Sequence, residues 1–173
     1  MEEQKPISHF LAGVIIGAVI VVYSLLLNFL GKGQDKTFGW IAYILFVAGI
    51  VIFVNLYGNA KSNEVSFGNL FSYGFKTTAI STLLILLCLV VIIFAMPDFK
   101  QKILDGMRKG LEDRGKLTDE QIDQSVDMFS RNFMLFVVGG ATFMYLLFGV
   151  IGSLIGAAIT KKKPINPLDQ MSI

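Results

Sequence analysis

The chain has 173 residues, of which 54% are hydrophobic and 16% are charged, and its formal net charge is +2. This composition leaves too few polar side chains to cover a soluble globule of this length, so it indicates an integral membrane protein surrounded by the lipid bilayer. The small net charge, without a basic face interleaved with aromatic residues, argues against a nucleic-acid partner.

The first predicted transmembrane helix covers residues 10–30, an uncharged apolar run about 31 Å long at helical rise. Its leader is acidic and its apolar core is longer than that of a cleaved signal peptide, so we expect the segment to be retained. His9, the only histidine, lies at its entrance, where an interfacial or capping role is favoured over proton handling. A short glycine-containing connection follows, which predicts an antiparallel neighbour.

The second span is predicted at residues 38–57, with Thr37 as its cap. Trp40 lies near one end and Tyr57 at the other, as expected for aromatic rings that prefer the headgroup level. These placements favour a complete crossing of the membrane.

The third span is predicted at residues 77–96 and should end at Pro97, because proline interrupts a helix. An amphipathic stretch at residues 66–76 precedes it, with apolar residues at helical spacing and Ser66 as a suitable N-cap. This stretch either lies in the membrane interface or extends the third span outward.

The longest polar stretch, residues 98–131, is predicted to form an amphipathic helical hairpin between the third and fourth spans. Gly115 separates its two helices, and Thr118 with Gln121 matches a capping box at the start of the second. Apolar residues form one stripe on each helix, and together they make a candidate interaction stripe: Phe99, Ile103, Met107, Ile122, Val126 and Phe129. These stripes should be buried on the membrane surface, on each other or on a partner.

The fourth span is predicted at residues 133–160 and is longer than the hydrocarbon layer requires, so it should tilt or project from the membrane. The first and fourth spans each carry a small-xxx-small pattern, which allows two helix backbones to approach closely in lipid. The candidate helix-packing residues are Gly13, Gly17, Gly152 and Gly156. The two patterns are expected to pack on each other within one chain, or one of them forms the seam of a homo-oligomer.

The sequence offers no catalytic constellation, so we expect no enzymatic activity, no cofactor and no metal site. The four apolar runs contain no Asp, Glu, Lys or Arg, which argues against ion-coupled transport. Carboxylates gather in the hairpin, but they alternate with basic residues and lack the loop of a calcium site, so a solvated face is favoured. Cys88 lies inside an apolar run and is interpreted as a small hydrophobic residue.

Four spans place both termini on one side of the membrane. Counting only lysine and arginine favours the hairpin side as cytoplasmic. We nevertheless prefer cytoplasmic termini, because Lys161, Lys162 and Lys163 follow the last span without a neighbouring acid, whereas acidic residues accompany the basic ones in the hairpin.

Several segments resemble the DUF4199 family of bacterial inner-membrane proteins. The resemblance rests on the chain length, the four-span pattern, residues 65–68 and 73–75 before the third span, and residues 117–122 before the fourth. It implies a multi-pass protein of the bacterial inner membrane but transfers no catalytic residue, because the family has no established activity. It also suggests a membrane-associated glycosyltransferase as a partner.

We therefore expect an all-α polytopic membrane protein, with residues 1–173 forming a single integral membrane domain. Its expected role is that of an accessory, assembly or scaffolding subunit in a bacterial envelope complex. The alternative is a small oligomeric transporter or lipid-handling protein, in which Asn28, Asn55 and the glycine-rich last span line a path.

Overall fold

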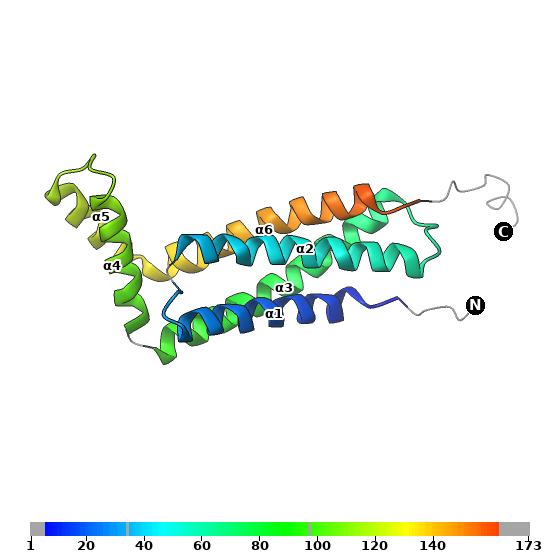
Figure 1. The fold of residues 1–173 in the computed structure, drawn as a ribbon, viewed down its shortest axis with the longest axis horizontal. Coiled ribbons are helices and arrows are strands. Elements are labelled where there is room, and N and C mark those ends of the chain that lie inside the picture. The colour runs from blue at the N-terminus through cyan, green and yellow to red at the C-terminus, as the bar shows by residue number, and fades with distance from the viewer. Residues whose placement is uncertain (1–5, 34, 97, 163–173) are drawn as a thin grey trace, which may run out of the picture.

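The computed structural model describes residues 6–33, 35–96 and 98–162. Within these ranges the chain forms six helices and no strand. Four long helices run side by side in an elongated bundle, and two shorter ones project from one end of it (Figure 1). The helices are α1 (His9–Phe29), α2 (Lys36–Ala60), α3 (Phe67–Ala95), α4 (Asp98–Glu112), α5 (Asp119–Arg131) and α6 (Phe133–Ile159).

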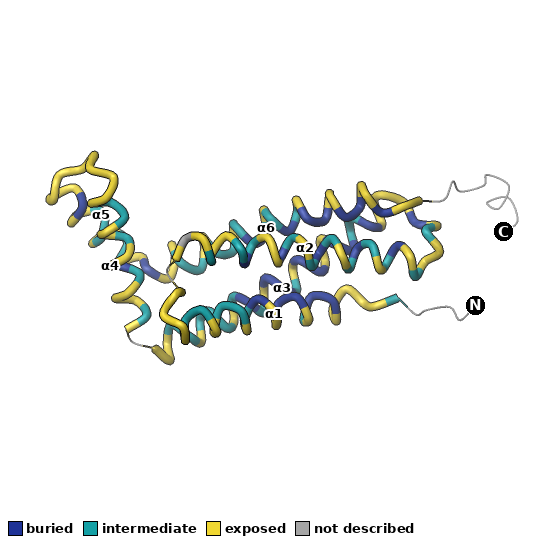
Figure 2. Tube along the Cα trace, viewed as in Figure 1, coloured by how far each residue is buried: buried dark blue, intermediate teal, exposed yellow. Residues whose placement is uncertain are grey.

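The four long helices, α1, α2, α3 and α6, correspond to the four predicted spans, and each is long and apolar enough to cross a membrane. Large apolar side chains are exposed along all four, among them Val22, Ile52, Leu83 and Phe143. Figure 2 shows exposed positions along the whole length of the bundle. Such an apolar outer surface is expected of a protein whose surroundings are lipid rather than water.

The bundle is packed around α3, which lies against α1 on one side and α6 on the other, while α2 packs against α6. Phe46, Ile50 and Val54 of α2 are fully buried, as are Ile20 of α1 and Leu70 of α3. Buried residues gather in the half of the bundle that holds the described ends of the chain (Figure 2). We call this half the terminal half and the other half, from which α4 and α5 project, the hairpin half.

The helix starts follow local capping chemistry. Ser8, not His9, caps α1, because its hydroxyl accepts a hydrogen bond from the backbone N–H of Leu11 at 3.2 Å. The predicted Thr37 cap of α2 is wrong: the Asp35 carboxylate accepts from the Thr37 N–H at 2.9 Å, so the helix begins before Thr37. A carboxylate at this position also suits the positive end of the helix.

Ser66 caps α3 as predicted, and its hydroxyl accepts from the Asn69 N–H at 3.2 Å. The helix then continues without a break to Ala95. The amphipathic stretch at residues 66–76 is therefore an extension of the third span and not a separate interfacial helix. The predicted stop at Pro97 and the basic residue Lys163 lie outside the described residues.

The projecting helices α4 and α5 form the predicted hairpin. Gly115 in the connection adopts a φ of +59°, a conformation that glycine reaches without strain. The capping box is complete: the Thr118 N–H donates to Gln121 Oε1 at 3.0 Å, and the Gln121 N–H donates to Thr118 Oγ1 at 3.4 Å. Hydrogen bonding to the Asp123 carboxylate, 2.6 Å away, raises the pKa of Arg108 and joins the two helices.

Candidate functional sites

The small-xxx-small glycines bring helices together, but the expected pairing of the two patterns is wrong. A Cβ on Gly13 or Gly17 of α1 would meet α3 side chains, Ile80 and Leu84, at 2.6 to 2.9 Å. Added Cβ atoms on Gly152 and Gly156 of α6 would instead meet α2, at 3.4 Å from Ile50 and 2.9 Å from Val54. Each pattern therefore packs against its own neighbour, because α3 lies between α1 and α6.

The apolar stripes of the hairpin are largely covered within the chain. Ile122 is only 3% exposed, and Leu104 of α4, which the predicted stripe omitted, is 8% exposed. The other stripe residues are half-buried: Phe99, Ile103, Met107, Val126 and Phe129. Phe129 also contacts α6, with ring centroids 5.2 Å from Phe136 and 6.0 Å from Phe133.

Two adjoining cavities of about 280 and 250 Å³ open inside the hairpin half of the bundle. Residues of α1, α2, α3, α4 and α6 line them, and α4 contributes Phe99 and Ile103. Tyr43 and Tyr145 border both, with ring centroids 5.2 Å apart, and Ser24 adds a hydroxyl. The lining is otherwise mainly apolar, so an alkyl chain fits its chemistry better than a charged solute does.

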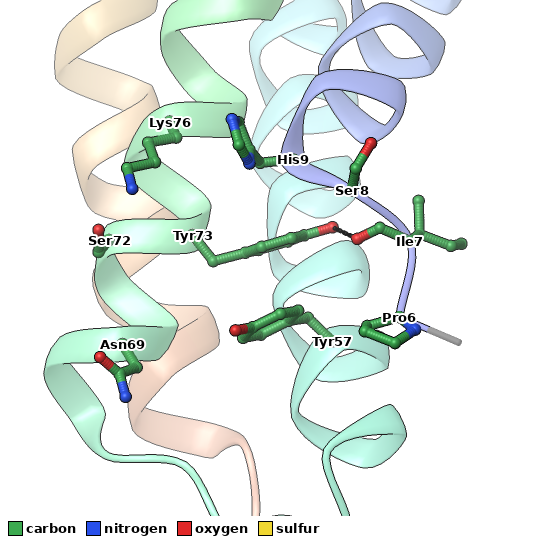
Figure 3. A pocket seen from close by; sticks show the side chains of 9 residues that line it. All are labelled: Pro6, Ile7, Ser8, His9, Tyr57, Asn69, Ser72, Tyr73 and Lys76. Atoms are coloured by element: carbon green, nitrogen blue, oxygen red, sulfur yellow. Dashed lines mark hydrogen bonds between the residues drawn. The ribbon is translucent and has the colours of Figure 1, made fainter. Parts of the chain in front are cut away.

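A different cavity, of about 340 Å³, lies at the terminal end of the bundle (Figure 3). Its lining is mostly polar and comes from the start of α1, the end of α2 and the first turns of α3. The α3 residues are Asn69, Ser72, Tyr73 and Lys76, whose spacing of three and four places them on one helix face. We call this the terminal cavity.

Two tyrosines fix the shape of the terminal cavity. The rings of Tyr57 and Tyr73 stack, with centroids 4.2 Å apart and planes inclined by 12°. The Tyr73 hydroxyl donates a hydrogen bond to the Ile7 carbonyl oxygen at 3.0 Å, which is visible in Figure 3. This bond holds the segment before α1 against α3, so His9 and Ser8 form one wall of the cavity.

Sequence reasoning missed a cluster of hydroxyl side chains buried in the terminal half of the bundle. Four of them lie on α3 and one on α6: Thr77, Thr78, Ser81, Thr82 and Ser153. Thr78, Ser81 and Ser153 donate to carbonyls one turn earlier in their own helices, at 2.7 to 3.0 Å. The hydroxyls of Thr77 and Thr82 have no hydrogen-bond partner among the residues that the structure describes. The four α3 hydroxyl residues lie on one helix face within an apolar run, and this spacing could have predicted the cluster.

The asparagines singled out from the sequence have separate positions. Asn28 lines one of the hairpin-half cavities, whereas the Asn55 side chain accepts a hydrogen bond from Asn59 at 2.9 Å on the exposed side of α2. Cys88 is half-buried and borders the larger of these cavities. Among the described residues, no group of three or more His, Cys, Asp or Glu side chains is placed to hold a metal ion.

The geometry therefore offers three features of interest: the hairpin, the apolar cavities beneath it and the polar terminal cavity. Comparison with curated proteins and with solved structures found no match. A family model described as "Protein of unknown function (DUF4199)" matches residues 11–162, which include all six helices apart from the first two residues of α1. Because this match covers most of the chain, the protein belongs to the DUF4199 family.

Proposed function

We propose that this protein is a non-enzymatic accessory or assembly subunit of a bacterial envelope complex, and that α4 and α5 carry its contact with a membrane protein partner. The observation that supports this proposal most directly is the construction of the hairpin. It has its own buried residues, Leu104 and Ile122, its own capping box and an ion pair between its helices. A connection that only joined two spans would need none of these features.

The outer surface of the hairpin is polar and carries isolated apolar side chains. Exposed charges of both signs alternate along it, including Lys109 and Glu120, and isolated apolar side chains lie among them. Met128 is 56% exposed and Leu117 is 40% exposed. Non-obligate interfaces are about as apolar as the rest of a protein surface, so this composition is compatible with a partner that associates and separates.

Photo-crosslinking in native membranes tests this role. A photoreactive residue at Lys109, on the exposed side of α4, should give discrete protein adducts. The control places the same residue at Phe143, which is 65% exposed on a span and should label lipid. If Lys109 yields neither a protein adduct nor a crosslinked copy of the chain, the proposed role is wrong.

A second candidate function is lipid handling, and the cavities of the hairpin half favour it. Filling the larger cavity with Ala141→Phe should then reduce lipid transfer between liposomes by purified protein. Gly140→Phe is the matched control, because a Cβ added at that exposed position would meet no atom within 4 Å. Equal transfer by both variants, or none by the wild type, would count against this function.

We further propose that the protein lies in the bacterial inner membrane with its termini in the cytoplasm. Cysteine labelling tests the orientation, in a Cys88→Ala background that removes the native thiol. A cysteine at the exposed position Lys116 should react with an impermeant reagent added outside, whereas one at Lys61 should not. The reverse pattern would place the hairpin in the cytoplasm.

A further inference from the structure

We propose that the terminal cavity binds the phosphate group of an anionic lipid headgroup. This inference is independent of the role proposed for the hairpin, which lies at the opposite end of the bundle (Figure 1). It rests on the chemistry of the lining, on the depth of the cavity in the membrane and on the charges around it.

The lining supplies donors and positive charge. Lys76 provides an ammonium group, His9 an imidazole, Asn69 an amide, and Ser72 and Tyr57 hydroxyl groups. These side chains come from α1, α2 and α3 and surround one space (Figure 3). None of the described residues that line the cavity carries a carboxylate. A phosphate oxygen accepts hydrogen bonds from all of these groups, and the bond from Lys76 is strengthened by charge.

The lengths of two helices are consistent with a cavity at the depth of lipid headgroups. From Lys76 to Ala95, α3 extends for roughly 30 Å, which equals the thickness of the hydrocarbon layer. The run of α1 from His9 to Phe29 has about the same length. If the far ends of both helices lie at one membrane surface, Lys76 and His9 lie at the other. Lipid phosphates occupy this level.

Charges near the cavity also favour an anion. Among the described residues, Lys61 follows the end of α2 and Lys161 and Lys162 follow the end of α6, whereas a single carboxylate, Glu64, lies between α2 and α3. Basic residues near the surface attract anionic lipids and raise their local concentration. The cavity itself then supplies the directed contacts that a diffuse charge lacks.

The size and rigidity of the site fit a headgroup. Its volume of about 340 Å³ lies within the range of small-molecule sites and exceeds what a single bound ion needs. The stacked rings of Tyr57 and Tyr73 and the bond from Tyr73 to Ile7 hold three of its walls in place. A preformed site of this kind avoids part of the ordering cost of binding.

Lipid binding by the full-length protein in nanodiscs tests the proposal. The discs contain phosphatidylcholine with a minor fraction of phosphatidylglycerol. Native mass spectrometry counts the phosphatidylglycerol molecules that stay bound to the protein after it is released from the disc. Lys76→Gln should weaken retention roughly tenfold or more, as expected for loss of a hydrogen bond to a charged group. Lys76→Arg keeps the positive charge and should retain phosphatidylglycerol as the wild type does. Lys61→Gln removes the same charge from the same end but lies outside the cavity, so it measures the surface effect alone.

A charge-neutral variant separates the cavity from the surface potential. Ser72→Leu fills the cavity without changing charge and should abolish retention, whereas Ala79→Leu on the exposed side of α3 should not. Equal retention by Lys76→Gln and Lys61→Gln, or full retention by Ser72→Leu, would overturn the site. Both exposed lysines can be replaced without disturbing the core, so a folded protein is expected in each case.

A second arm distinguishes the source of the phosphate. In discs of pure phosphatidylcholine, added inorganic phosphate or glycerol 3-phosphate should not raise the thermal stability of the protein. Inclusion of phosphatidylglycerol in the discs should raise it. Stabilisation by the soluble phosphates, without preference for the anionic lipid, would overturn the assignment to lipid.

Discussion

Replacement of Gly74 by alanine tests the packing of the terminal half most directly. Gly74 lies on α3 where this helix meets both α2 and α6. An added Cβ would lie 2.8 Å from Ser153 Oγ, 2.9 Å from Ser153 Cβ and 2.9 Å from Val54 Cγ2. Ser153 and Val54 are fully buried, and the Ser153 hydroxyl is held by a 2.7 Å hydrogen bond to the Gly149 carbonyl.

Two effects of opposite sign decide the result. Alanine favours the helix by about 1 kcal/mol over glycine. Forcing an extra methyl group into a filled core costs about 1 to 3 kcal/mol. Because Ser153 and Val54 belong to two different helices and neither has free space beside it, we place the cost of Gly74→Ala near the upper end of this range. The net expectation is a loss of about 1 to 2 kcal/mol in the free energy of unfolding.

Gly140→Ala is the matched control, because it makes the same substitution in α6 at a position where a Cβ meets nothing within 4 Å. It should stabilise the protein by up to about 1 kcal/mol. Midpoints of unfolding in mixed detergent and SDS report both changes. A Gly74→Ala protein as stable as Gly140→Ala would refute the packing argument. Ser153→Gly removes two of the three crowding atoms, so the cost of Gly74→Ala should shrink in that background.

Four further substitutions test other parts of the structure. Thr82→Val removes a buried hydroxyl that has no partner among the described residues, so the unfolding midpoint should stay the same or rise. Thr78→Val removes a 3.0 Å hydrogen bond to a carbonyl of its own helix and should lower the free energy of unfolding by about 0.5 kcal/mol. Ile122→Asp places a carboxyl group at a 3% exposed position of the hairpin and should cost about 3 kcal/mol or more, with faster hydrogen exchange in α4 and α5 and unchanged exchange in α3. Thr118→Ala removes the cap of α5 and should cost about 1 kcal/mol, seen as faster exchange confined to its first turn.

The order and type of the helices could be predicted because the signals lie within each segment. An uncharged apolar run of about 20 residues indicates a transmembrane helix, whatever surrounds it in the sequence. Thr118 and Gln121 specify the start of α5 by local hydrogen bonds. The Thr37 error has the same origin: Asp35 and Thr37 lie two positions apart and both have side chains suited to a cap, and only the backbone path shows that Asp35 is the cap.

The neighbours of each helix could not be predicted in the same way. In lipid an apolar side chain gains little by facing the core instead of the membrane, so hydrophobicity does not mark the buried face. The buried faces of α3 and α6 are marked instead by small and hydroxyl residues, such as Gly74, Thr78 and Ser153. The small-xxx-small patterns of Gly13 and Gly152 predict close helix contacts, but which helix each glycine contacts depends on the arrangement of all four long helices.

Packing changes along the bundle, and this change separates the two kinds of cavity. In the terminal half, glycines bring α3 and α6 into contact with their neighbours, and the polar terminal cavity lies on the outside of a closely packed core. In the hairpin half, Gly139 and Gly140 contact no other helix, and apolar cavities remain beneath Phe99 and Ile103 of α4. A partner that displaces α4 therefore alters the apolar cavities first. The headgroup site at the other end keeps its walls, because none of its lining residues belongs to α4, α5 or α6. The partner and the lipid should consequently bind independently, and a measured coupling between them would require a movement of α1, α2 or α3, which line the cavities at both ends.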